Sequence, residues 1–312
     1  TFLDAYRGRG RSAGARRLTF AAGSDVTISN VTDATGMPVV AGPRSREVLA
    51  GLTDTTGDPV AALDLAGRLA ELVDRIGIGA GEKILDLGCG DGTTALPAAE
   101  RGAQVTGVDI AENLVAAGRR RAEAAGLTNI DFEEGDASNL ESIDDGKFDR
   151  VVSIFGAMFA PNPDSVASEM VRVTRPGGQI VMGNWIPGDP TLVAQVLKTS
   201  AAFTPPPPEG FVSPMLWGQD DKVRERFAKA GIPHDRIICE RDSFMFRHDG
   251  PPAEFVDRFT RFYGPTMNAL DAAEQSGRAD ELRSELGRLF EAHNQSGDPG
   301  RRGIERHHGT RP

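Results

Sequence analysis

Residues 84–93 read Ile-Leu-Asp-Leu-Gly-Cys-Gly-Asp-Gly-Thr, and this stretch organises the chain. Its apolar opening ends in an acidic residue and predicts a short buried strand. Three glycines at every second position favour a tight turn, because glycine adopts backbone conformations that side chains exclude. The residues from Thr94 to Arg101 then predict the start of a helix. A ligand on this turn would face backbone N–H groups and the positive end of a helix, which is typical of a nucleotide site.

The spacing of the glycines separates two kinds of nucleotide site. Dinucleotide-binding turns have the pattern G-x-G-x-x-G, whereas Gly88, Gly90 and Gly92 give G-x-G-x-G. The strand also ends in Asp86, whose carboxylate would repel a pyrophosphate but accept hydrogen bonds from a positively charged amino-acid group. The turn with its acidic residue resembles motif I of the class I S-adenosylmethionine-dependent methyltransferases, and later landmarks follow in that family's order from about residue 58 to 296.

The second strand ends in Asp109, 23 residues after Asp86. An acid at this position can accept both hydroxyl protons of a ribose, although it suits a dinucleotide equally well. Its alternative role is to cap the next helix. The resemblance implies that Asp136 binds an adenine amino group, while the alternative is an ordinary turn aspartate. The full set of cofactor-binding residues that the resemblance implies is Asp86, Gly88, Cys89, Gly90, Asp109, Ile110, Asp136, Ala137 and Ser153.

The acceptor side is less well defined. By resemblance, the loop after Ser153 faces the acceptor, and it lacks the acid-or-Asn, two prolines and aromatic of enzymes that methylate amines of nucleic-acid bases. A net charge of -10 also argues against a nucleic-acid partner. We therefore expect a small-molecule acceptor. Aromatic residues either shape its pocket or form the core of a lid, and those assigned to the pocket are Phe155, Phe159, Trp185, Trp217 and Tyr263. No general base is assigned, because each of the five histidines is better explained as solvent-facing or terminal.

Strands alternate with helices from Ile84 onward, which predicts a doubly wound, mostly parallel α/β sheet of the Rossmann-like class. A helical lid is expected after the fifth strand, in segments 186–232 and 250–295. The family's usual last strand is missing from the sequence, so the sixth strand lacks a neighbour unless an N-terminal strand substitutes. The expected strands are 84–87, 103–108, 130–134, 148–154, 179–184 and 236–247, and the expected helices are 93–101, 112–125, 164–174 and 220–230. A turn is expected at residues 174–178.

Three regions are expected along the chain. Residues 1–55 form a basic arm, and the run from Asn30 to Leu49 resembles a piece of the aminomethyltransferase-like domain of dimethylglycine and sarcosine dehydrogenases. Residues 56–297 form the methyltransferase domain, in which Leu72, Val73 and Ile76 belong to the apolar side of a helix. Residues 298–312 form a disordered tail. Residue 1 is Thr rather than Met, which favours a fragment or a fusion.

The composition of the chain limits the kinds of structural site and the cellular locations that we expect. Two cysteines exclude a disulfide framework and a cysteine-rich metal site, and no membrane span or signal peptide is visible. A cytoplasmic location is expected. The oligomeric state stays open. Two alternatives to a methyltransferase also stay open: a nicotinamide-dependent oxidoreductase, and a non-catalytic cofactor-binding module or damaged fusion protein.

Overall fold

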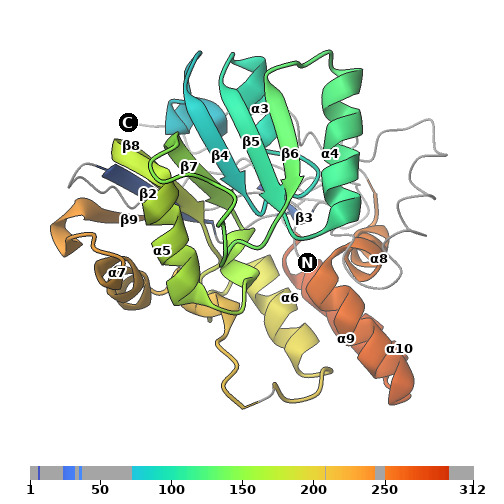
Figure 1. The fold of residues 1–312 in the computed structure, drawn as a ribbon. Helices are drawn as coiled ribbons and strands as arrows, with labels where there is room; N and C mark the ends of the chain where they lie inside the picture. Colours follow the sequence, from blue (N-terminus) through green and yellow to red (C-terminus); the bar gives the residue numbers. More distant parts are fainter. Residues whose placement is uncertain are drawn as a thin grey trace, which may run out of the picture.

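Seven parallel strands form one sheet in the order β6-β5-β4-β7-β8-β2-β9 in the computed structural model (Figure 1). The structure describes residues 6–7, 24–31, 35–36, 72–207, 209–242 and 250–294. The strands of this sheet are β2 (Ser24–Val31), β4 (Lys83–Leu87), β5 (Gln104–Asp109), β6 (Ile130–Glu134), β7 (Phe148–Ile154), β8 (Thr174–Gly183) and β9 (Ile237–Asp242). A separate short pair joins β1 (Tyr6–Arg7) to β3 (Thr35–Gly36).

The helices alternate with the central strands as the sequence predicts. Helix α4 packs on β5 and β6, and α5 packs on β7 and β8, so that both cover the sheet in the manner of a doubly wound fold. The α-helices are α3 (Ala95–Glu100), α4 (Glu112–Ala124), α5 (Pro163–Val173), α6 (Leu192–Ala201), α7 (Asp220–Lys229), α8 (Pro252–Phe262), α9 (Gly264–Gln275) and α10 (Ala279–Ala292). Short 3₁₀ turns are η2 (Ala157–Phe159), η3 (Pro214–Gly218) and η4 (His234–Arg236).

An N-terminal strand completes the sheet. Strand β2 lies between β8 and β9 and is parallel to both, with Ser29 opposite Gly183 and Val26 opposite Ile237. It therefore pairs with the side of β9 that would otherwise lack a neighbour. The substitute N-terminal strand that the sequence left open is present as β2.

The turn expected before the fifth strand, at residues 174–178, lies inside strand β8 instead. Strand β8 already begins at Thr174, which pairs with Phe148, and the register then shifts so that Arg150 pairs with Gln179. Several residues of β8 thus oppose a single residue of β7, which is the geometry of a bulge. Gly177 has a φ of 79°, a conformation that suits glycine at such an irregularity. Proline and glycine here distort a strand instead of preceding one.

The helices after β8 form a second layer near the carboxyl ends of the strands. Helix α10 contacts α6, α8 and α9, and Figure 1 shows α6, α9 and α10 beyond the arrow tips of β5 and β6. Phe255, Phe259 and Phe290 pack edge to face, with ring centroids 5.0–5.3 Å apart. Leu282 and Leu286 are buried beside them. The predicted helical lid is therefore a cluster of helices that pack through their apolar sides.

Some predictions fall outside the described residues. The described residues include only the short strands of the arm, none of residues 37–71 and none of the tail. The domain boundaries and the aminomethyltransferase-like resemblance therefore stay predictions. Residues 72–76 are helical, and Leu72, Val73 and Ile76 are buried as expected. Of the helices in the described ranges, none has the length and apolar character needed to cross a bilayer.

Candidate functional site

The glycine-rich turn after β4 has the conformation that its sequence demands. Gly88, Gly90 and Gly92 have φ values of 70°, 56° and 89°, a region that residues with side chains rarely adopt. The N–H groups of Gly88 and Cys89 both donate to the carbonyl of Val108, at 2.7 and 3.0 Å. The turn is thereby tied to the end of β5. The carboxyl ends of β4 and β5, which both carry predicted ligand-binding residues, consequently lie next to each other.

Asp109 bridges the turn and the following helix. Its Oδ2 accepts from the N–H of Gly90 and its Oδ1 accepts from the N–H of Ala111, both at 2.9 Å. Ala111 is the N-cap of α4, so Asp109 joins the turn to the start of this helix. Each carboxylate oxygen has a second lone pair. Asp109 can therefore hold the turn in place and still accept hydrogen bonds from a ligand.

A cleft of about 80 Å³ follows the ends of β4, β5, β6 and β7. Ile110 contributes an apolar surface to it and is 51% exposed, so its side chain is open to a ligand. Six of the residues predicted to bind cofactor or acceptor line this cleft: Gly88, Asp109, Ile110, Asp136, Ala137 and Phe159. The other lining residues are Val108, Gly135, Gly156, Ala157, Ala160 and Pro161.

Asp136 lies in a local turn at the edge of the cleft. Its Oδ1 accepts from both the backbone N–H and the hydroxyl of Ser138, at 2.8 Å each, which is the pattern of an aspartate that shapes its own turn. The N–H of Gly135 donates to the carbonyl of Asp109 at 3.0 Å. The turn after β6 is thus linked to the end of β5, and the two acids face one cleft.

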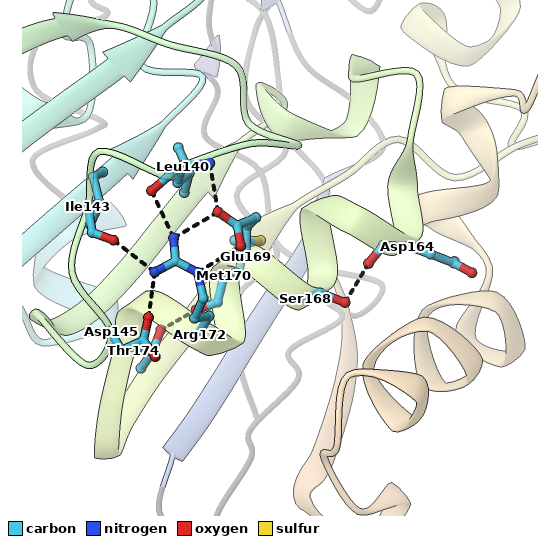
Figure 2. Close-up of polar contacts among 9 residues, drawn as sticks. All are labelled: Leu140, Ile143, Asp145, Asp164, Ser168, Glu169, Met170, Arg172 and Thr174. Carbon is cyan, nitrogen blue, oxygen red and sulfur yellow. Dashed lines mark hydrogen bonds and ion pairs between the residues drawn. The ribbon is translucent and has the colours of Figure 1, made fainter.

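Arg172 on α5 holds the loop that follows this turn (Figure 2). Its guanidinium donates to the carbonyls of Leu140 and Ile143, both at 2.8 Å, and to Asp145 at 2.6 Å. Glu169 pairs with the same guanidinium at 2.8 Å and accepts the N–H of Leu140 at 2.6 Å. These hydrogen bonds lower the pKa of Glu169 and raise that of Arg172. One helix therefore fixes the far end of the segment that carries Asp136.

Asp86 is buried beneath the turn and does not line the cleft. It is 2% exposed, and its Oδ2 has no hydrogen-bond partner among the described residues. Burial, and then the nearby charge of Asp109, raise the pKa of Asp86 to about 8, against the hydrogen bond from the Ala95 N–H. Burial also raises the pKa of the Cys89 thiol. Near neutral pH the site thus holds a protonated carboxyl and a neutral thiol next to the turn.

Ser153 supports the loop after β7. Its side chain is fully buried, and its Oγ accepts from the N–H of Ala157 at 2.9 Å. The same loop brings Gly156 against Gly88, where a Cβ added to Gly88 would lie 2.5 Å from Gly156 Cα. The cleft is closed at this end by backbone. Gly90, which donates to Asp109, likewise lies in the turn and outside the lining.

The predicted acceptor aromatics divide into two groups. Phe159 lines the cleft. Phe155 and Trp185 are buried and stack with ring centroids 4.4 Å apart and planes at 28°. Trp217 is buried under the guanidinium of Arg226, 4.6 Å from its ring centroid. Tyr263 is buried beside Trp185, and burial raises its pKa. Only Phe159 of this set lines the cleft, whereas the other four side chains pack in the lid core.

Gly156, which lines the cleft, and Asn184, which does not, are absent from the sequence-based set. Gly156 meets Gly88 between neighbouring strands, a contact that no local pattern signals. Asn184 directly follows β8, is fully buried, and has neither amide atom hydrogen-bonded among the described residues. An asparagine at the carboxyl end of a predicted strand was the available signal. In the described ranges no group of three or more His, Cys, Asp or Glu side chains is placed to hold a metal ion.

Comparison with known proteins identifies the kind of site. Residues 84–178, which contain the turn, Asp109, Asp136 and the loop after β7, match the model of a methyltransferase domain. Uncharacterized protein Rv1403c of Mycobacterium tuberculosis is 36% identical over 208 residues, which covers 66% of this chain and 72% of that protein. The chain belongs to the same family as this mycobacterial protein, and its residues 84–178 form a methyltransferase domain.

Two further methyltransferases resemble it over shorter ranges. Methyltransferase GfsG of Streptomyces halstedii is 37% identical over 130 residues, 41% of this chain and 46% of that protein. A crystal structure of a SAM dependent methyltransferase from Aquifex aeolicus is 16% identical, with a TM-score of 0.42 over 62% of this chain and 95% of that one. The methyltransferase expected from the glycine turn is confirmed, which decides against the nicotinamide-dependent oxidoreductase.

Proposed function

We propose that this methyltransferase binds S-adenosylmethionine at the glycine turn and transfers its methyl group to a small molecule, leaving S-adenosylhomocysteine. The observation that carries the proposal is the pair of buried acids at the turn. Asp109 bonds the turn from one side, and Asp86 lies beneath it with an unpartnered Oδ2. An unpaired buried oxygen is costly unless a ligand satisfies it.

The residues at the site fit the three parts of this cofactor. Asp109 accepts the ribose hydroxyls through its remaining lone pairs. Ile110 covers one face of the adenine, while Asp136 and the N–H of Ala137 bind its edge; all three line the cleft. The carboxylate of Asp86 accepts a hydrogen bond from the ammonium of the methionine end, either directly or through the backbone of the turn. This division of roles agrees with the presence of an acid at the turn, because its carboxylate would repel a pyrophosphate.

Catalysis requires little from the chain beyond placement. The sulfonium of the bound cofactor supplies an already activated methyl group. The chain's own residues then bind the cofactor, orient the acceptor and exclude water, and good orientation contributes roughly 7–11 kcal/mol. A general base is needed only for an acceptor that must lose a proton. No residue is assigned that role.

The acceptor is small and binds beside the cofactor cleft, which the backbone contact of Gly88 with Gly156 closes at one end. A movement of the loop after β7 would open this end. The lid helices are suited to cover the acceptor afterwards. The acidic net charge favours partners other than nucleic acid. We also propose a cytoplasmic location, which agrees with the presence of only two cysteines in the sequence.

Calorimetric titration of the full chain with S-adenosylhomocysteine and with NAD tests the cofactor. We expect binding of S-adenosylhomocysteine alone. Binding of NAD alone would overturn the proposal, as would the absence of both. A methyl-transfer screen with S-adenosylmethionine across phenols, amines and thiols then tests the acceptor class, with transfer to a DNA or RNA oligonucleotide as the outcome that contradicts a small molecule.

A further inference from the structure

Asn184 presents a buried amide whose hydrogen-bonding capacity is unused. The residue follows β8, its side chain is fully buried, and neither Oδ1 nor Nδ2 has a partner among the residues that the structure describes. Native structures satisfy most buried polar side chains, and the exceptions require an explanation. A leucine of similar size would be the more stable choice at a site with no ligand. The amide therefore points to a function.

The position of Asn184 connects it to the cleft. The preceding carbonyl, that of Gly183, accepts the N–H of Phe155 at 2.9 Å. The following residue, Trp185, stacks on the ring of Phe155. Phe155 begins the loop that closes the cleft through Gly156. Asn184 thus lies at the carboxyl end of β8, between two residues that both contact Phe155.

A second unsatisfied donor lies in the turn η3, which contacts the residue after Asn184. The indole Nε1 of Trp217 is buried and has no hydrogen-bond partner within the described part of the chain. Gly218, its neighbour, packs its backbone against the carbonyl of Trp185, where any side chain would clash. The turn η3 that carries Trp217 also contacts η2 of the closing loop. Two residues with unused polar atoms therefore flank one backbone contact between the lid and the sheet.

We propose that Asn184 and the indole N–H of Trp217 form the polar wall of the acceptor site, and that the acceptor is an uncharged planar molecule with a hydroxyl or amide beside a carbonyl. The proposal rests on the proposed function. The Asn184 oxygen accepts from the hydroxyl or amide, while the Asn184 nitrogen and the indole donate to the carbonyl. Both protein groups are neutral, so an uncharged acceptor loses least when it leaves water.

Access to this wall requires the closing loop to change conformation. Phe155 has a φ of 61° and is the one residue other than glycine with a positive φ in the described ranges. This conformation is strained for a residue with a side chain. Release of Phe155 from it would separate Gly156 from Gly88 and extend the cleft toward Asn184. The strain thus favours the movement that brings acceptor and cofactor together.

The test compares wild type with Asn184→Leu, using S-adenosylhomocysteine and salicylamide, a neutral planar probe with a hydroxyl beside a carboxamide. We expect the variant to bind S-adenosylhomocysteine within about twofold of wild type, because Asn184 does not line the cofactor cleft. Salicylamide should bind the S-adenosylhomocysteine complex of wild type at least about tenfold more tightly than that of the variant. The midpoint of thermal unfolding of the free variant should equal or exceed that of wild type.

Each outcome of this experiment either supports or overturns the proposal. Thr266→Val is the matched control, since Thr266 is equally buried but accepts a hydrogen bond from Ser200 at 3.5 Å; it should leave salicylamide binding unchanged. Equal salicylamide affinity in wild type and Asn184→Leu, no binding to wild type, or a fall of more than about 4 °C in the unfolding midpoint of Asn184→Leu would overturn the proposal. Failure of wild type to bind S-adenosylhomocysteine would instead overturn the proposed function.

Discussion

The backbone of Gly88 lies against the backbone of Gly156, and a Cβ added to Gly88 would be 2.5 Å from Gly156 Cα and 2.9 Å from the N of Ala157. Real Cβ atoms do not approach other atoms this closely. The two segments come from different strands, β4 and β7, which lie next to each other in the sheet. Their contact depends on the absence of a side chain at both positions, and it closes the cofactor cleft.

Replacement of Gly88 by alanine should destabilise the fold. Alanine would adopt a φ of 70° and meet the Gly156 backbone, so we expect a loss of at least about 2 kcal/mol in the free energy of unfolding. Gly188→Ala is the control, because Gly188 has a φ of 71° but no atom within 4 Å of the added Cβ. Chemical denaturation measures both. Equal losses in the two variants would show that the backbone contact contributes nothing.

Asp109→Asn should weaken cofactor binding. The substitution keeps the size of the side chain but removes the charge that strengthens hydrogen bonds to the ribose hydroxyls. Loss of one such bond corresponds to about a tenfold rise in the dissociation constant of S-adenosylhomocysteine. Calorimetry measures it, with the exposed Asp131→Asn on β6 as control. An unchanged dissociation constant for Asp109→Asn would contradict the ribose assignment.

Binding of S-adenosylhomocysteine should strengthen as the pH rises from 6 to 8. In the free protein burial raises the pKa of Asp86 to about 8, so this carboxyl is protonated at pH 6. A bound ammonium favours the ionised carboxylate and lowers that pKa, so binding releases a proton below pH 8. The affinity should rise by up to about tenfold per pH unit and level off above the free pKa. Calorimetry in buffers of different ionisation enthalpy measures the number of protons that binding releases. Release of the same proton by Asp86→Asn would assign the proton to another group.

The sequence predicts the local parts of this site well. The conformation of the turn follows from Gly88, Gly90 and Gly92 alone, since their φ values are ones that glycine favours. The proximity of Asp109 and Asp136 follows from the order of parallel strands, because carboxyl ends of neighbouring strands meet at one edge. Both depend on short-range chemistry or on a topology that alternating strands and helices make almost unavoidable.

The parts that the sequence does not predict depend on contacts between distant residues. Nothing near Gly156 indicates that it must meet Gly88, and nothing near Asn184 indicates that its amide lacks a partner. The aromatic residues after β8 have the same helical spacing whether they line a pocket or fill a core. The choice between these interpretations depends on how the lid packs. Pro176 and Gly177 likewise suit a turn or a bulge equally, and pairing with β2 and β7 decides for the bulge.

Arg172→Lys should loosen the segment after β6. The guanidinium of Arg172 bonds Glu169, Asp145 and two backbone carbonyls (Figure 2), and a lysine ammonium cannot reproduce this planar fork. We expect a loss of about 2–4 kcal/mol in unfolding free energy and weaker binding of S-adenosylhomocysteine, because the same segment carries Asp136. Lys222→Ala, which removes an exposed ion pair with Glu225, should leave stability nearly unchanged. Denaturation and calorimetry measure the two effects; a stability loss for Arg172→Lys no larger than that of the control would show that the network does not hold this loop.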